Sequence, residues 1–364
     1  MSYSEADVQG ALKNLIDPNT GKDFVSGKSV KNVKISGSDV SLDIMLGYPA
    51  RSVWDEIRAM VEAHLKAALP GCGSVNANVT SKVVPHAVQR GAKLVDGVKN
   101  IIAVASGKGG VGKSTTAVNI ALALAAEGAR VGMLDADIYG PSQPTMLGIS
   151  GQPGMSGESF MEPMTNHGLQ AMSIGFLIDS EETPMIWRGP MVTQALGQLL
   201  RQTRWDDLDY LIVDLPPGTG DIQLSLAQQV PVTGAVIVTT PQDIALMDAR
   251  KGLKMFEKVG VKIIGIVENM STHICSKCGH EEHIFGAGGG EKMCADYHTE
   301  LLGSLPLDIR IREQTDSGKP TVVADPDGNV AKTYKQIARR IAVKVAEIAQ
   351  SHSTIFPKVV VQNT

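Results

Sequence analysis

A glycine-rich stretch at residues 106–115 constrains the fold of this chain more than any other feature. It follows an apolar, strand-like run at 100–106 and opens onto a run with helical spacing of apolar residues at 113–127. A strand, a loop of pattern G-x4-G-K-[ST] and a helix are typical of a nucleoside triphosphate site, because glycines let backbone N–H groups close around phosphates. The residues expected to contact the nucleotide are Gly107, Lys108, Gly109, Gly110, Val111, Gly112, Lys113, Ser114 and Thr115.

Three side chains of this loop carry the predicted chemistry. Lys113 is expected to place its charge on the outer phosphates, and Ser114 is expected to offer its hydroxyl to Mg²⁺. Lys108 is one lysine more than the pattern needs, and one loop does not easily bring both ammonium groups to the same phosphate oxygens. We therefore expect Lys108 to act from a second subunit, which predicts a homodimer with ATP at its interface.

Beyond this loop the chain alternates between strand-like and helix-like runs. The strand runs are apolar without alternation, as in parallel strands that are covered on both faces. This order predicts an α/β fold with a doubly wound, mostly parallel sheet, whose ligands lie at the carboxyl ends of the strands. The expected strands are 101–106, 131–135, 211–215, 235–240 and 263–268, and the expected helices are 113–127, 189–203, 222–229, 244–259 and 330–349.

Shifts in pattern divide the chain into segments. Residues 1–85 predict a small α/β domain, residues 86–98 a linker without periodicity, residues 99–350 the P-loop ATPase domain, and residues 351–364 a tail. Within the ATPase domain, residues 150–168 are rich in Gly, Ser and Met and are expected to form a long surface loop. The small domain is expected to have the order α-β-β-α-β, with helices at 8–16 and 53–69 and strands at 30–35, 40–46 and 75–79.

Composition argues against several classes of protein. The net charge of the 364 residues is −4, which indicates neither a nucleic-acid-binding nor a membrane-binding surface. The first residues lack the cationic and apolar segments of a signal peptide, and no apolar run reaches the ~20 residues of a membrane span. The four cysteines are too few for a disulfide scaffold. We therefore expect a cytoplasmic protein.

Acidic and amide side chains follow three of the predicted strands. Asp135 and Asp137 come directly after the apolar run 131–134, and Asp214 ends the run 210–214. A carboxylate at the end of a buried strand is costly unless it is paired or near a metal. We expect Asp214 to hold Mg²⁺ and Asp137 to orient the attacking water or to touch Mg²⁺, although both residues of the first pair could simply cap a turn. Asn269 either contacts an adenine edge or is a plain turn residue.

A C-x-x-C pair, Cys275 and Cys278, is the second strong signal. It is compatible with a structural zinc site completed by His280, His283 or Cys294, with a redox dithiol, or with half of a site that a second subunit completes. Spacing alone favours zinc, whereas the predicted dimer favours a four-cysteine site that suits a [4Fe–4S] cluster. Two other cysteines are expected to have structural positions only: Cys72 in a turn and Cys294 as a buried apolar residue.

Eight stretches of the sequence together resemble the Mrp/ApbC family of iron–sulfur cluster carriers, in the deviant P-loop class that includes nitrogenase iron protein and the MinD/ParA ATPases. The stretches are 107–114, 135–142, 187–190, 214–221, 268–270, 275–279, 284–286 and 312–320. The resemblance covers about residues 98–350. Residues 1–85 resemble the small iron–sulfur-assembly domain that is often fused in front of such carriers.

This resemblance implies ATP binding with slow hydrolysis, a homodimer, and a transferable [4Fe–4S] cluster bridged by Cys275 and Cys278 of both subunits. It also suggests Lys108 as the lysine that acts across the dimer. The implied partners are apo iron–sulfur proteins, which receive the cluster, and cluster scaffold proteins.

Three other functions are compatible with parts of the pattern. A MinD/ParA-like positioning ATPase would need an amphipathic membrane helix at the C-terminus, for which the tail is too short, or a basic DNA-binding surface, which the charge count disfavours. An electron-transfer ATPase like nitrogenase iron protein would keep its cluster through redox cycles. A zinc-stabilised P-loop ATPase would carry no cluster at all.

Overall fold

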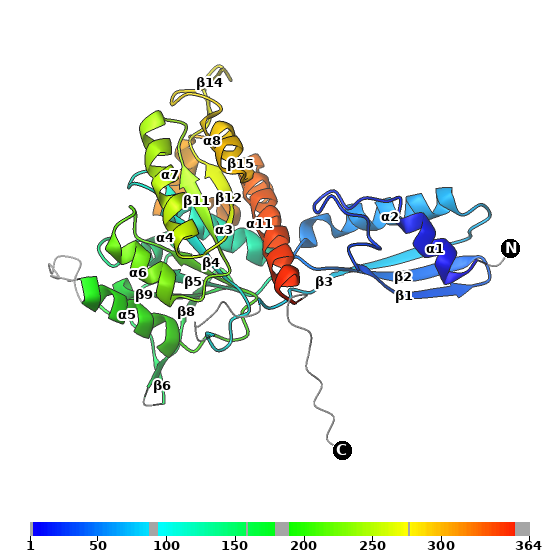
Figure 1. The fold of residues 1–364 in the computed structure, drawn as a ribbon, viewed down its shortest axis with the longest axis horizontal. Helices are drawn as coiled ribbons and strands as arrows, with labels where there is room; N and C mark the ends of the chain where they lie inside the picture. The colour runs from blue at the N-terminus through cyan, green and yellow to red at the C-terminus, as the bar shows by residue number, and fades with distance from the viewer. Residues whose placement is uncertain (1–2, 87–93, 158, 179–188, 276, 354–364) are drawn as a thin grey trace. The chain divides into compact units, whose positions relative to one another are not determined.

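The computed structural model describes residues 3–86, 94–157, 159–178, 189–275 and 277–353 (Figure 1). The chain divides into two compact units, one made of Met1–Val84 with Ala126–Gly128 and the other of Pro85–Ala125 with Ala129–Thr364. Part of the predicted linker (87–93) and most of the predicted tail (354–364) lie outside the described residues. In the described part of the chain, no helix is both long and apolar enough to cross a membrane.

The N-terminal unit has the predicted order α-β-β-α-β. Its sheet has the strand order β1-β2-β3, with β1 antiparallel and β3 parallel to β2. Valine, leucine and isoleucine side chains on one face of each helix are buried, because this face packs toward the sheet or the other helix. The elements are α1 (Glu5–Leu12), β1 (Val30–Ser36), β2 (Asp39–Leu46), α2 (Trp54–Ala68) and β3 (Val75–Ser81).

The second unit contains an eight-stranded sheet with the order β15-β12-β11-β4-β10-β5-β9-β8. All of its neighbouring strands are parallel except β8, which is antiparallel to β9. The predicted doubly wound, mostly parallel α/β fold is therefore confirmed. The strands are β4 (Ile101–Ala105), β5 (Val131–Asp135), β8 (Met164–Asn166), β9 (Leu169–Ser173), β10 (Tyr210–Asp214), β11 (Gly234–Thr239), β12 (Ile263–Glu268) and β15 (Leu301–Ser304).

Helices cover this sheet, and all residues of β4, β5, β10 and β11 are buried, as the unbroken apolar runs predict. Helix α7 packs on β11, and α11 packs on β15 and β12. The helices of this unit are α3 (Lys113–Ala126), α4 (Gln143–Met146), α5 (Gly189–Gln202), α6 (Asp221–Gln229), α7 (Asp243–Lys258), α8 (Gly289–Tyr297), α9 (Ile309–Asp316), α10 (Thr321–Ala324) and α11 (Asn329–Ser353).

The segment 150–168 lies at the surface, as predicted, but it is not loop throughout. This segment contains the two-stranded pair β6 (Met155–Ser156) and β7 (Phe160–Met161), and it ends in β8, the edge strand of the large sheet. A tight turn at His167 and Gly168, both with positive φ, lets β8 fold back onto β9. Strands of two or three residues are too short to show alternation, so their pairing depends on this turn and on the neighbouring strand.

Candidate functional site

The P-loop lies between β4 and α3, at the carboxyl ends of the parallel strands. Gly110 and Gly112 adopt positive φ values of 81° and 79°, which favour glycine. A Cβ atom on Gly109 or Gly110 would meet no atom within 4 Å, so this side of the loop is open. A Cβ atom on Gly107 would instead collide with the backbone of Asp248 in α7. The loop is thus backed by α7 and open where a polyphosphate would bind.

Two further segments hold this loop in shape. The Ser106 hydroxyl donates to the Lys108 carbonyl over 2.9 Å, inside the loop. The buried Asn269 amide, just beyond β12, donates from Nδ2 to the Val111 carbonyl over 2.9 Å. The backbone N–H of Gly218 donates to the Ser106 carbonyl over 2.9 Å. The structure therefore brings Asn269 to the P-loop, where its amide nitrogen donates a hydrogen bond to the loop backbone. A contact between Asn269 and adenine stays a prediction.

Lys113 and Asp214 form a buried ion pair at the base of the loop. The Lys113 ammonium also lies 3.0 Å from the Ser114 hydroxyl, so the two predicted Mg²⁺ ligands, Ser114 and Asp214, share one lysine. A carboxylate buried this deeply needs a partner of opposite charge or a metal ion. In this structure Lys113 is that partner.

Gln143, at the start of α4, completes the surroundings of Asp214 and was not among the predicted site residues. Its buried side chain donates from Nε2 to Asp214 Oδ2 over 2.9 Å and to the Ser114 carbonyl over 3.2 Å. The sequence offered one signal, because Gln143 directly follows the stretch 135–142 that carries the family resemblance.

Asp135 organises the loop after β5. Its buried carboxylate accepts the backbone N–H groups of Asp137 (3.1 Å), Ser142 (3.0 Å) and Gln143 (3.0 Å) and the Ser173 hydroxyl (3.1 Å). Burial raises the pKa of Asp135 to about 7, and the nearby carboxylate at the end of β10 adds to this rise. The side chain therefore fixes the loop rather than facing a ligand.

Asp137 is only partly buried, and it lies on the loop that Asp135 holds. Burial raises its pKa above the usual value, while the charge of Lys113 acts in the opposite direction. Asp137 is therefore near enough to the P-loop lysine for the charge of Lys113 to act on its carboxylate. This position is compatible with the predicted water-orienting role.

The side chain of Lys108 differs from that of Lys113. Lys113 is buried against Asp214, whereas Lys108 is partly exposed, and within the described residues its ammonium group makes no hydrogen bond or ion pair. Its charge is therefore available to a ligand or to another chain.

Cys275 and Cys278 lie on a hairpin made by β13 (His273–Ile274) and β14 (Glu281–Glu282). The turn is closed by hydrogen bonds from the Cys275 N–H to the His280 carbonyl (2.9 Å) and from the Gly279 N–H to the Cys275 carbonyl (2.8 Å). Hydrogen bonds from the backbone N–H groups of Cys278 and Lys277 and from the Cys278 side chain lower the pKa of Cys275. The two thiols thus lie together on a turn where Cys278 is exposed.

The other candidate ligands lie differently. Cys294 is buried in α8, as predicted, and burial raises the pKa of its thiol to about 11. His283 uses Nδ1 in a hydrogen bond to the Ser271 carbonyl over 2.9 Å. In the residues that the structure describes, no group of three or more His, Cys, Asp or Glu side chains is arranged to hold a metal ion. Cys72 lies in the turn after α2, as predicted.

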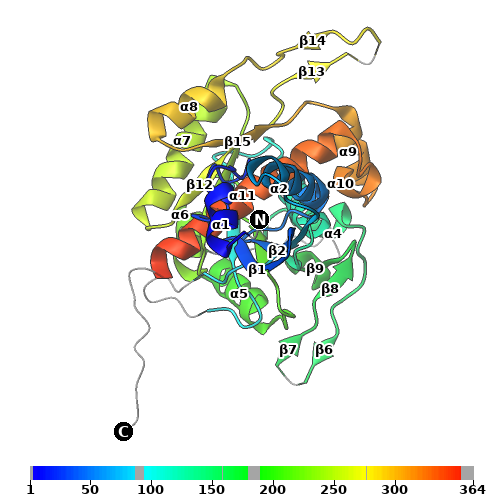
Figure 2. The ribbon, with the colours of Figure 1, turned by 90° about the vertical axis from the view of Figure 1, so that its right-hand side faces the viewer.

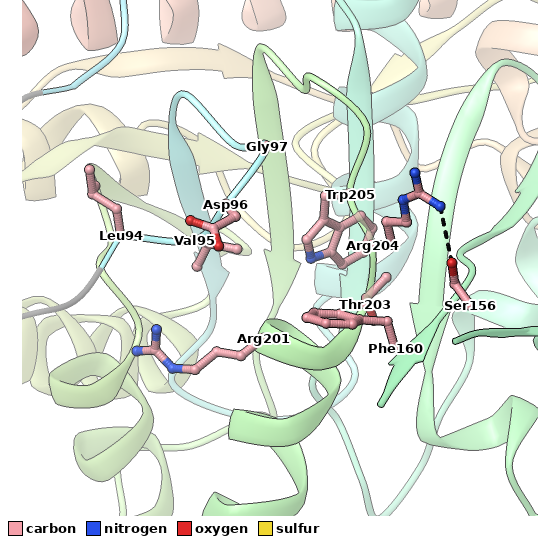
Figure 3. Close-up of a pocket in the computed structure, with 10 residues that line it drawn as sticks. All are labelled: Leu94, Val95, Asp96, Gly97, Ser156, Phe160, Arg201, Thr203, Arg204 and Trp205. Carbon is pink, nitrogen blue, oxygen red and sulfur yellow. Dashed lines mark hydrogen bonds between the residues drawn. The ribbon is translucent and has the colours of Figure 1, made fainter. Parts of the chain in front are cut away.

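A separate pocket of about 400 Å³ lies away from this site (Figure 3). Gly97, shortly before β4, and Trp205, shortly before β10, line it, so it lies near the amino ends of these strands. The Phe160 ring and the Arg204 side chain form other parts of its wall, and Arg204 donates to Ser156 over 3.0 Å. Ligands of doubly wound sheets bind at the opposite, carboxyl edge.

One stretch that carries the family resemblance, 187–190, is described only in part, because residues 187 and 188 lie outside the described residues.

Comparisons with known proteins agree over both units. Residues 97–342 match the family model described as NUBPL iron-transfer P-loop NTPase, and residues 5–79 match that described as iron–sulfur cluster assembly protein. The chain is 50% identical over 341 residues to the iron–sulfur cluster carrier protein of Escherichia coli (strain K12), covering 93% of this chain and 92% of that relative. It is 53% identical over 251 residues to the iron–sulfur cluster transfer protein NUBPL of Mus musculus, covering 68% and 78%.

Two solved structures are similar to the second unit. The nucleotide-binding protein of Archaeoglobus fulgidus in complex with ADP has a TM-score of 0.56 and 35% identity, over 64% of this chain and 91% of that chain. The cell division ATPase MinD of Pyrococcus furiosus has a TM-score of 0.51 and 23% identity, over 66% and 98%, and so shares the fold alone.

Proposed function

Because this chain belongs to the NUBPL iron-transfer P-loop NTPase family, we propose that it binds and hydrolyses ATP and carries a [4Fe–4S] cluster to apoproteins. The observation that carries this proposal is the Cys275–Cys278 turn. It presents two neighbouring thiols, one of them exposed, on the same unit as a P-loop that is open to phosphates. A thiolate pair that can be reached from solvent suits a cargo that must be released.

The two thiols of one chain supply half of the four cysteine ligands that a [4Fe–4S] cluster prefers. Two copies related by a two-fold axis would supply all four from the same two positions. The lowered pKa of Cys275 favours the thiolate form, which is the form that binds iron. We therefore place the cluster, as cargo, between two copies of this chain.

Hydrolysis in this proposal uses groups already positioned at the strand ends. The P-loop N–H groups and Lys113 bind the phosphates, and Asp137 orients the water that attacks the γ-phosphorus as the bond to ADP breaks. Ser114 and Asp214 lie side by side around one lysine and offer the oxygen ligands that Mg²⁺ prefers. When bound, Mg²⁺ would offset the negative charge that develops on the phosphates.

Lys108 supports the dimer in this proposal. The Lys108 side chain is partly exposed, and its ammonium group makes no ion pair within the described part of the chain. The Lys113 ammonium, in contrast, is buried and pairs with Asp214 of the same chain. We assign Lys108 to the phosphates of the partner copy. The proposed partners are apo iron–sulfur proteins and cluster scaffold proteins, in the cytoplasm, without nucleic acid or membrane.

Anaerobic reconstitution tests the cargo. The expected result is about four iron and four sulfide per dimer with the visible spectrum of a [4Fe–4S] cluster, and transfer to an apo-acceptor faster than free iron and sulfide rebuild its cluster. Cys278→Ala should lose the iron, and Cys294→Ala, the matched control, should keep it. One zinc ion per chain, retained without oxygen and lost in His283→Ala, would overturn the carrier proposal and indicate a zinc-stabilised ATPase.

Mixing two inactive variants tests the dimer. Lys108→Ala and Lys113→Ala each remove one lysine from the site. In mixed dimers, one site keeps both lysines if Lys108 acts across the interface, and neither site does if it acts within its own chain. ATP hydrolysis should therefore recover on mixing, and the absence of recovery in verified mixed dimers would contradict action across the interface.

A further inference from the structure

Helix α9 lies between the two sites of the proposed function and has no part in either. It belongs to the stretch 312–320 that carries part of the family resemblance without an assigned role. In Figure 2, α9 and α10 lie between the hairpin of β13 and β14 and helix α4. Contacts at both ends of α9 connect it to these two elements.

At its first end, α9 is attached to the strand that leads to the cysteine pair. The Leu307 N–H donates to the Thr272 carbonyl over 2.7 Å, and His273 Nδ1 donates to the Leu307 carbonyl over 3.0 Å. Asp308 then caps the helix, since its carboxylate accepts the Arg310 N–H over 2.9 Å. Cys275 is two residues beyond His273, so a shift of this helix end moves the backbone that carries the thiol.

At its other end, α9 meets the end of α4 through two glycines. Gly318 follows α9 with φ of 76°, and Gly148 follows α4 with φ of 61°. A Cβ atom on Gly318 would lie 2.7 Å from the Cα atom of Gly148, closer than real Cβ contacts. His167 Nε2 donates to the Gly318 carbonyl over 2.8 Å, and Asn166 Nδ2 donates to the Leu147 carbonyl over 2.7 Å. The β8–β9 turn therefore clamps both helix ends together.

Helix α4 is in turn attached to the nucleotide site. Gln143 bonds the Asp214 carboxylate and the Ser114 carbonyl, as described above. Lys113 is the ion-pair partner of Asp214 in this network. Phosphates in the P-loop would compete for Lys113 and leave Asp214 with a different set of partners, which changes the anchor of Gln143 and α4. This exchange of partners would give the network a second arrangement.

We propose that α9 transmits the occupancy of the nucleotide site to the Cys275–Cys278 pair. Its eight residues form a rod about 12 Å long, fixed to α4 at Gly318 and to β13 at Leu307. The second helix of this segment, α10, is also held to the P-loop helix, because the Val322 N–H donates to Asn119 Oδ1 over 3.1 Å. The proposal rests on the proposed function only in requiring that ATP binds at the P-loop.

The test is the rate at which iodoacetamide alkylates Cys275 and Cys278 in reduced, cluster-free protein, with and without ATP and Mg²⁺. In the unmodified chain, nucleotide should change this rate at least about five-fold, the lower end of typical coupling between sites. Gly318→Ala wedges α9 away from Gly148, so the nucleotide effect should disappear while the rate without nucleotide stays within about two-fold. The matched control is Gly151→Ala, with φ of 93° and open space around the new Cβ, which should keep the effect.

A milder variant guards against misfolding of Gly318→Ala. His167→Asn keeps the left-handed φ of 50°, which asparagine tolerates, but it is too short to reach the Gly318 carbonyl. It should reduce the nucleotide effect at unchanged ATP affinity. An unchanged effect in both variants, or no effect in an unmodified chain that binds ATP, would overturn the role of α9 and leave the carrier function standing. A chain that binds no ATP would instead overturn the proposed function together with this coupling.

Discussion

The P-loop site and the cysteine hairpin differ in how much one chain supplies. At the P-loop, segments from four strand ends meet, and every buried charge has a partner: Lys113 with Asp214, and Asp135 with three backbone N–H groups. At the hairpin, two thiols lie on a turn between two-residue strands, and Cys278 is exposed. The comparison teaches that charges inside the core of one chain must find their partners there, whereas thiols on an exposed turn stay open to groups from outside the chain.

The largest effect is expected when the buried ion pair is broken. Lys113→Ala should lower ATP hydrolysis at least about 100-fold, because a charge positioned on the phosphates is lost. It should also lower the free energy of unfolding by about 3–5 kcal/mol, because Asp214 keeps an uncompensated buried charge. Denaturant unfolding and steady-state hydrolysis measure the two effects.

The control for this variant is Lys113→Ala combined with Asp214→Asn. Removal of the orphaned charge should restore most of the stability and none of the hydrolysis. If Lys113→Ala alone were as stable as the unmodified chain, the claim that Lys113 compensates the buried charge of Asp214 would be wrong.

The alkylation rates of Cys275 and Cys294 should depend differently on pH. Only the thiolate reacts with iodoacetamide, so a raised pKa delays reaction to higher pH. At pH 8, Cys294, with a pKa of about 11, is about one part in 1,000 thiolate, whereas Cys275, with a pKa lowered from 9.0, is at least about one part in ten. Cys275 should therefore react about 100-fold faster in reduced protein without cluster.

Mass spectrometry of each cysteine across pH 6 to 11 measures this difference. The pH at which the rate reaches half of its maximum should lie below 9 for Cys275, while the rate at Cys294 should still rise toward pH 11. If the alkylation rates of Cys275 and Cys294 reached half of their maxima at the same pH, the predicted difference between their pKa values would be wrong.

The smallest effect is expected at Asn269. Asn269→Ala leaves the Val111 carbonyl without its partner, at a cost of about 1–3 kcal/mol, part of which should appear as nucleotide affinity weakened up to about ten-fold. If the amide only holds the loop, ATP and GTP weaken equally; if it contacts adenine, ATP weakens more. Calorimetric titration of both nucleotides decides this, with the exposed Asn76→Ala as the unaffected control.

Much of the fold could be predicted because its signals are local. Unbroken apolar runs located β4, β5, β10, β11 and β12, and helical spacing located α3 and α7, within one or two residues of their ends. Three strands of the large sheet were missed: β8 and β15 have only three or four residues and show no period of their own, and β9 has polar residues that break its apolar run. The pairing of β8 with β9 and of β15 with β12 depends on neighbours that only the folded sheet provides.

The sequence by itself located the candidate chemical groups of this protein. The P-loop, the acids at the strand ends and the paired thiols each follow from residue types at close spacing, because backbone conformation and ligand reach are local properties. Only the tertiary structure decided how these groups are connected. The bond from Asn269 to Val111 spans 158 residues, and that from Gln143 to Asp214 spans 71. Such contacts form where buried polar groups must find partners among whatever segments the packed core brings beside them, and no spacing along the chain encodes that choice.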